Sequence, residues 1–130
     1  MHTQIRSNNA PAAIGPYSQA ICTNNRLYIS GQLGVDAVTG EIPAAFADQA
    51  ALVMKNIGFV LAEAGFKFED IVKTTIFLSS MDNFAAVNEI YGSHFTEYKP
   101  ARSCIEISRL PKGAMVEIEV IAEKRQNIQK

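Results

Sequence analysis

The chain has 130 residues, of which 48% are hydrophobic and 19% are charged, and its formal net charge is −1. This length suits a single domain over residues 1–130 and is too short for two. Its 12 basic and 13 acidic residues include no run of Lys or Arg, which argues against a phosphate-binding surface and hence against a nucleic-acid partner.

Cysteine usage and hydropathy favour an intracellular protein. Cys22 and Cys104 share no CxxC or other paired spacing, so no disulfide framework is predicted. Residues 1–6 contain no apolar signal-peptide core, and no later stretch approaches about 18 uninterrupted apolar residues. We therefore expect a cytoplasmic protein with no membrane partner.

A tight hairpin is the first element that the sequence predicts. Two apolar-rich runs, 17–22 and 27–30, flank Asn24-Asn25, and Asn tolerates the positive φ that a two-residue turn requires. If these two residues form the loop, Tyr17 and Ser30 become diagonal neighbours on one face of the hairpin.

Two helices and a central strand follow. Short strand and turn segments are expected over 32–43, and apolar residues then recur at helical spacing from Ala44 to Ala64, with Gly65 as the terminator. The β-branched run 71–79 predicts a strand. A second helix is expected after Asp82 as its N-cap. Its predicted buried residues are Phe84, Val87, Tyr91 and Phe95.

The last third of the chain predicts two strands, about 102–108 and 115–123, that form a hairpin with one apolar and one polar face. The apolar face is expected to contain Ile105, Ile107, Val116, Ile118 and Val120. The polar face is expected to contain Arg102, Cys104, Glu106, Glu117 and Glu119. The element order favours an α+β fold with both helices on one face of the sheet. Self-association is the first expectation for the uncovered face.

Familiar catalytic motifs are absent from the sequence. It contains no GxSxG, Walker, GxGxxG or HExxH pattern. His2 and His94 are the only histidines, one terminal and one on a predicted helix, so neither a His-based metal site nor a catalytic triad is expected.

Arg102 is the best candidate ligand-binding residue, because a guanidinium can hold a carboxylate through two hydrogen bonds. A salt bridge to Glu117 or Glu119 across the hairpin is an equally good interpretation. Glu117 could orient or deprotonate a water molecule if it is partly desolvated. A solvated strand carboxylate is the plainer interpretation, and Glu119 is an equal rival.

Three further positions have a structural and a functional interpretation. Cys104 could be a nucleophile, but no histidine is placed to form a thiolate, so a packing role is favoured. Tyr17 could donate a hydrogen bond into a pocket or pack with its hydroxyl at the rim. Ser30-Gly31 could present a hydroxyl and an approachable backbone, or form a turn.

Several segments together resemble the RidA (YjgF) family across essentially the whole chain. The resemblance is carried, in order and spacing, by residues 9–20 (NAPAAIGPYSQA), 29–32 (ISGQ), 39–41 (TGE), 70–75 (DIVKTT), 100–104 (PARSC), 109–112 (RLPK) and 117–119 (EIE). It implies a chorismate-mutase-like α+β fold and a homotrimer with three sites in the clefts between subunits.

The resemblance also implies an activity. RidA-like proteins hydrolyse reactive 2-imino or enamine acids, such as 2-iminobutanoate and 2-iminopropanoate, to 2-keto acids and ammonia without a metal or organic cofactor. By position, Arg102 is expected to bind the substrate carboxylate and Glu117 to orient the attacking water. The pocket is expected to be lined by Tyr17, Ser30, Gly31, Asn88 and the backbone of Cys104.

One departure from the family pattern concerns the substrate range. The stretch 96–100 is a few residues shorter than in many relatives, which could alter the cleft wall beside Arg102. Two other functions stay open, a carboxylate-binding or chaperone-like trimer without catalysis, and RNA cleavage. The presence of both Arg102 and Glu117 favours catalysis, because a binding protein needs the arginine but not the carboxylate.

Overall fold

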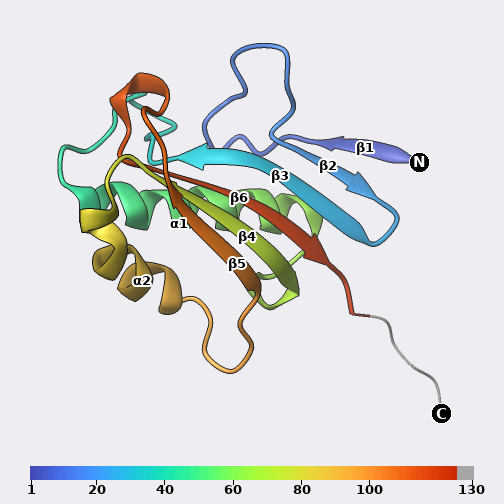
Figure 1. The fold of residues 1–130 in the computed structure, drawn as a ribbon. Helices are drawn as coiled ribbons and strands as arrows, with labels where there is room; N and C mark the ends of the chain where they lie inside the picture. Colours follow the sequence, from blue (N-terminus) through green and yellow to red (C-terminus); the bar gives the residue numbers. More distant parts are fainter. Residues whose placement is uncertain (126–130) are drawn as a thin grey trace.

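The computed structural model describes residues 1–125, which form a six-stranded mixed sheet with two helices against one of its faces (Figure 1). The elements are β1 (His2–Ile5), β2 (Ala20–Thr23), β3 (Arg26–Leu33), α1 (Phe46–Ala64), β4 (Ile71–Leu78), α2 (Phe84–Gly92), β5 (Ala101–Glu106) and β6 (Val116–Glu123). The strand order is β1-β2-β3-β6-β4-β5. Only β4 and β5 run parallel, and every other neighbouring pair is antiparallel.

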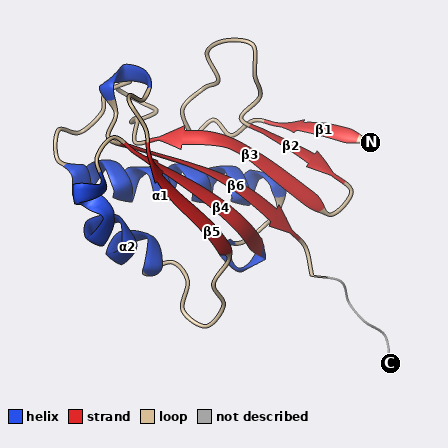
Figure 2. Ribbon diagram, in the orientation of Figure 1, coloured by secondary structure: helices blue, strands red, loops and turns tan. Residues whose placement is uncertain are grey.

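The core lies between the sheet and the helices. Figure 2 shows α1 behind the sheet and α2 beside its β5 edge. Strict alternation along β6 places Val116, Ile118, Val120 and Ala122 in the core. The facing residues of α1 recur at helical spacing and are almost fully buried: Ala50, Val53, Met54, Ile57, Val60 and Leu61. This burial fixes which face of each central strand points away from the helices.

Several predicted elements are confirmed. Thr23 pairs with Arg26, so Asn24-Asn25 is the two-residue loop of the β2–β3 hairpin, and Asn24 has a φ of 45°. α1 ends where Gly65 adopts a φ of 80°, the left-handed conformation that glycine allows. The predicted α+β class, with both helices on one face, is also confirmed.

The predicted hairpin of the last two strands is wrong. β5 pairs with β4, because α2 carries the chain back so that β5 can run parallel to β4. β6 lies between β3 and β4 and does not contact β5 as a neighbour. Thr74 pairs with Arg102 on one side and with Val120 on the other, so all three residues share the face that the helices cover.

This pairing corrects the predicted faces. Arg102, Cys104 and Glu106 lie on the helix side of β5, whereas Glu117 and Glu119 lie on the opposite, open face. Ile105, predicted to be buried with Val116, is 45% exposed on the open face, beside Phe77. Alternation along each strand was predicted correctly, but the polar side of β5 lies on the face of the sheet opposite to the polar side of β6.

Smaller differences occur at the ends of elements. β1 carries no alternating pattern and was not predicted. Asp82 is not the N-cap of the second helix: Ser80 Oγ accepts the Asp82 N–H and caps a short 3₁₀ turn that leads into α2. Phe84 is 37% exposed and does not lie in the core as predicted. Within residues 1–125, neither helix is long and apolar enough to span a bilayer.

Candidate functional site

Arg102 is held at the start of β5 by side chains of α2. Its Nη1 donates a 2.6 Å hydrogen bond to Asn88 Oδ1. The guanidinium carbon lies 5.6 Å from the centre of the Phe84 ring and 5.4 Å from that of the Tyr91 ring. Among residues 1–125 Arg102 forms no ion pair, so the alternative of a salt bridge across a hairpin is wrong. Most of its N–H donors are left for a ligand.

Phe84, Asn88 and Tyr91 share one face of α2, because they stand at positions i, i+4 and i+7. The apolar pattern of the second helix predicted that both aromatic residues lie in the core, and it gave no indication that they contact Arg102. Their helical spacing with Asn88 was the available signal. The parallel β4–α2–β5 connection was needed to bring that face to the strand.

A β-bulge shapes the open face around Glu117. Ile29 pairs with Val120 and Gln32 pairs with Ile118. Ser30-Gly31 therefore oppose a single residue of β6, Glu119. The Glu117 carboxylate covers Gly31 closely. A Cβ atom on Gly31 would lie 2.5 Å from Glu117 Oε2, so a side chain at position 31 would displace the carboxylate.

Glu117 differs from its rival in its surroundings. It is half-buried, between Leu33 of β3 and Phe77 of β4 in the register, whereas Glu119 is exposed. Burial raises the pKa of Glu117 above its ordinary value, and the nearby charge of Glu119 raises this pKa further. A carboxyl with a raised pKa is suited to exchanging protons near neutral pH. These surroundings favour Glu117 over Glu119 as the acid–base group.

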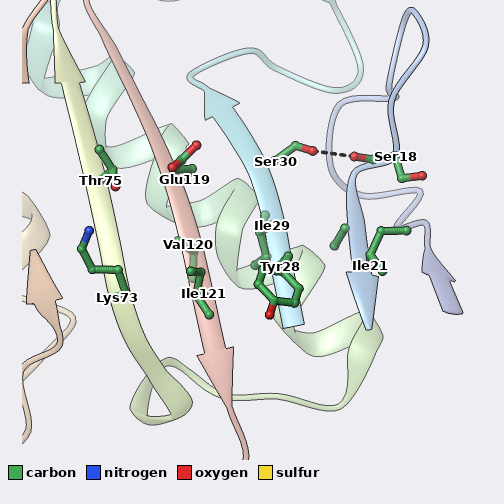
Figure 3. A pocket seen from close by; sticks show the side chains of 11 residues that line it. Ser18, Ile21, Tyr28, Ile29, Ser30, Lys73, Thr75, Glu119, Val120 and Ile121 are labelled. Atoms are coloured by element: carbon green, nitrogen blue, oxygen red, sulfur yellow. Dashed lines mark hydrogen bonds between the residues drawn. The ribbon is translucent and has the colours of Figure 1, made fainter. Parts of the chain in front are cut away.

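The pocket of about 360 Å³ on the open face lies beside the bulge (Figure 3). Ser30 lines it together with Lys73, Thr75 and Glu119, and Ser30 Oγ donates a 2.6 Å hydrogen bond to the Ser18 carbonyl. A second pocket, of about 540 Å³, is lined by Tyr17 and residues of the 4–19 segment. Neither of these pockets includes Arg102 or Glu117.

Tyr17 does not lie where the hairpin predicted it. β2 begins at Ala20, and the Tyr17 N–H donates to the Gly15 carbonyl in a preceding turn. The side chain is 52% exposed. Tyr17 and Ser30 therefore line different pockets and do not face one another as strand neighbours.

Cys104 is partly buried against the core on the helix side of β5. Burial raises the pKa of its thiol, and the Arg102 charge only partly offsets that effect. These surroundings favour the neutral thiol and support a packing role. Among residues 1–125, no three His, Cys, Asp or Glu side chains cluster closely enough to hold a metal ion.

The expected site residues do not form one cluster within the chain. Tyr17 and Ser30 line separate pockets, and the remaining residues form two groups. Arg102, Asn88 and Cys104 lie on the helix side near the β5 edge. Gly31 and Glu117 lie on the open face at the bulge. β4 separates β5 from β6, which alone places roughly 10 Å between those two backbones.

Known proteins resemble this chain over nearly its whole length. Residues 7–124 match the family model described as endoribonuclease L-PSP. The chain is 47% identical, over 96% of its length and 100% of the relative's, to the 2-iminobutanoate/2-iminopropanoate deaminase of Escherichia coli strain K12.

Solved structures share the fold. A putative endoribonuclease from Thermotoga maritima superposes with a TM-score of 0.94 at 39% identity, covering 97% of this chain and 100% of that one. Escherichia coli TdcF, solved with bound serine, superposes with a TM-score of 0.91 at 40% identity, covering 95% and 99% of the two chains.

Proposed function

The chain belongs to the endoribonuclease L-PSP family, which includes the RidA (YjgF) proteins, and we propose that it hydrolyses 2-imino acids to 2-keto acids and ammonia. The Escherichia coli relative, which this chain matches over 100% of that protein's length, is named as a deaminase of 2-iminobutanoate and 2-iminopropanoate. The bound serine of TdcF is a small molecule with a carboxylate, the group that Arg102 is suited to hold.

The reaction needs only modest help. Water adds to the electrophilic carbon of the iminium, a C–O bond forms, and a carbinolamine results. The C–N bond then breaks, the carbon becomes a ketone, and nitrogen leaves as ammonium after receiving both water protons. In the proposed mechanism Arg102 holds the carboxylate, and Glu117 accepts a proton from the attacking water and returns it to nitrogen.

The observation that carries the proposal is the state of Arg102. Its guanidinium is fixed by Asn88 and by two aromatic faces, yet within residues 1–125 no carboxylate neutralises it. An arginine that only stabilised the fold would be expected to pair with an acidic side chain, and within residues 1–125 Arg102 has no such pair. The guanidinium is thus preorganised for an external anion.

The separation of Arg102 from Glu117 supports a site shared between subunits. We propose that the chain forms a chorismate-mutase-like homotrimer, in which the Arg102 group of one subunit meets the Glu117 group of its neighbour. The open face, which exposes Tyr28 and Ile105, would be covered in this assembly. The proposal requires neither a nucleic acid nor a cofactor.

A coupled assay tests the activity. Threonine dehydratase generates 2-iminobutanoate in situ, and release of 2-ketobutyrate is followed with and without the protein. We expect acceleration over spontaneous hydrolysis, loss of turnover in Arg102→Ala, and a fall of about 10²-fold or more in Glu117→Gln with carboxylate binding retained.

Two matched variants control this assay. Arg26→Ala removes an exposed arginine whose 3.4 Å ion pair with Glu123 lies at the surface, and should keep full activity. Glu119→Gln removes the neighbouring carboxylate and should keep most of it. Equal losses in Glu117→Gln and Glu119→Gln would contradict the assignment of the acid–base residue. No acceleration with any imino acid would favour a carboxylate-binding protein.

RNA cleavage is a second candidate, because the family model and the Thermotoga maritima structure carry endoribonuclease in their names. The net charge of −1 gives little attraction for a phosphate backbone. Incubation of the protein and of Arg102→Ala with single-stranded RNA separates the possibilities. Cleavage that survives in both samples would point to a contaminant, and cleavage that Arg102→Ala abolishes would favour the RNase.

A further inference from the structure

Two aromatic rings flank the Arg102 guanidinium. Phe84 and Tyr91 lie two turns apart on α2, and their ring centres lie 5.6 Å and 5.4 Å from the guanidinium carbon. Attraction to an aromatic face uses the ring quadrupole and consumes no N–H donor. The rings therefore restrain the cation while its free donors stay available, and only one hydrogen bond, to Asn88, is spent within residues 1–125.

The inner ring is fixed by a buried polar contact. The Tyr91 hydroxyl lies 2.8 Å from Thr74 Oγ1, and Thr74 is 1% exposed on the core side of β4. Its neighbours Ile76 on β4 and Val120 on β6 are buried and apolar, so valine would fill this position without burying a hydroxyl. The contact between the two hydroxyls fixes the orientation of the Tyr91 ring. Arg102 pairs with Thr74 in the register, so the ring is held beside Arg102.

We propose that Tyr91, anchored by Thr74, and Phe84 are positioning residues that hold the Arg102 guanidinium in the orientation that a substrate carboxylate requires. This inference rests on the proposed deaminase function. An exposed arginine loses much rotamer freedom when it binds a ligand, and restraint by the rings before binding reduces that loss. Both rings act through the guanidinium, so in this proposal their effect falls on carboxylate affinity and leaves the chemical step unchanged.

The test compares binding with turnover. Phe84→Leu and Tyr91→Leu should each raise KM for 2-iminobutanoate, and Kd for the product 2-ketobutyrate, about two- to fivefold, with kcat within about twofold of wild type. Tyr91→Phe keeps the ring but loses the contact with Thr74, so it should weaken binding less than Tyr91→Leu and about as much as Thr74→Val. Thr74→Val should weaken binding in the wild-type background but not in Tyr91→Leu, because it acts through Tyr91.

Two readouts separate positioning from a general packing defect. The neutral amide of 2-ketobutyrate should bind all variants with unchanged affinity, because it lacks the charge that Arg102 recognises. The Arg102 Nε–H NMR signal should lose its ring-current shift when a ring is removed. Met81→Ala, which trims an exposed apolar side chain three residues before Phe84, is the matched control and should behave as wild type.

Tyr91 is 8% exposed, so Tyr91→Leu could fail to fold, whereas Phe84 is 37% exposed and decides the test in that case. Unchanged 2-ketobutyrate affinity in folded Phe84→Leu, or an equal loss for the neutral amide, would overturn the inference. If 2-ketobutyrate binding depends on Arg102 and Phe84 but the protein accelerates no imino-acid hydrolysis, the proposed function fails and the positioning role stands.

Discussion

The two faces of the sheet differ in how they hold their main charged residue. On the helix side, Arg102 is exposed at an edge strand, where Asn88 and aromatic rings from α2 restrain it. On the open face, Glu117 belongs to the central strand β6, is half-buried, and lies over the backbone of Gly31. The cation is thus left accessible, and the carboxyl of Glu117 is made easier to protonate.

Under the proposed function, neither face alone would be a complete site. A guanidinium alone can bind an anion, and a desolvated carboxyl alone can exchange a proton, but hydrolysis of an imino acid needs both at one carbon. Because the sheet itself separates the two groups, a second copy of the chain is the simplest way to unite them.

The largest expected effect comes from mixing two inactive variants. If the Arg102 group and the Glu117 group of one site belong to different subunits, coexpression of Arg102→Ala with Glu117→Ala should restore about a quarter of wild-type activity, the fraction of interfaces that pair two intact groups in a closed ring. The coupled assay on the mixed protein measures this recovery.

Coexpression of wild type with the Arg102→Ala/Glu117→Ala double variant is the matched control. It should retain about a quarter of the activity if each site spans two subunits, and about half if each site lies within one subunit. A complete lack of recovery in the first mixture, together with half activity in the second, would contradict the shared site.

A smaller effect is expected from adding one methyl group to the open face. In Gly31→Ala the new Cβ would meet the Glu117 carboxylate, which is the end of a flexible side chain and can move. Turnover should fall about tenfold, less than in Glu117→Gln, because the acid–base group is displaced but not removed, while thermal stability changes little. Gly92→Ala, where a Cβ meets no atom within 4 Å, is the control. If folded Gly31→Ala kept wild-type turnover, the proposed catalytic role of Glu117 would be wrong.

The smallest expected effect is a shift in pH dependence. Glu119 helps to raise the pKa of Glu117, so Glu119→Gln should lower that pKa and move the acidic limb of the kcat/KM profile to lower pH. The sign follows because only ionised Glu117 accepts a proton from water. Folding raises the pKa of Glu117, so the protein loses stability as pH rises from the ordinary pKa of this carboxyl to its raised pKa. Glu119→Gln should reduce that loss of stability.

The control for this shift is Glu123→Gln, which removes a carboxylate further along β6 that pairs with Arg26. Its profile should coincide with that of wild type. An acidic limb that stays in place in Glu119→Gln, or moves equally in Glu123→Gln, would mean that another group controls the profile.

Much of the fold could be predicted because it depends on local sequence patterns. The Asn24-Asn25 turn and the helix ending at Gly65 depend on backbone preferences of single residues, and both are confirmed. The order and spacing of short motifs sufficed to identify the family. β1 was missed because its four residues show no alternation.

The arrangement of the candidate site could not be predicted in the same way. Alternation correctly separated Arg102 from Ile105 and Glu117 from Ile118, but it assigns two sides to each strand without stating which side meets the helices. The error arose when polar residues of the last two strands were assumed to share the open face. Arg102 tolerates the helix side because α2 covers an edge strand with polar and aromatic residues.

By itself, the sequence determined the helices, the first hairpin and the family, and it predicted Arg102 as the candidate carboxylate ligand and Glu117 or Glu119 as the candidate proton acceptor. Tertiary structure decided that β6 lies between β3 and β4, and hence that Arg102 and Glu117 lie on opposite faces. The physical reason is that turns and helices depend on neighbours in the chain, whereas strand order depends on long-range pairing and on which surfaces the helices bury.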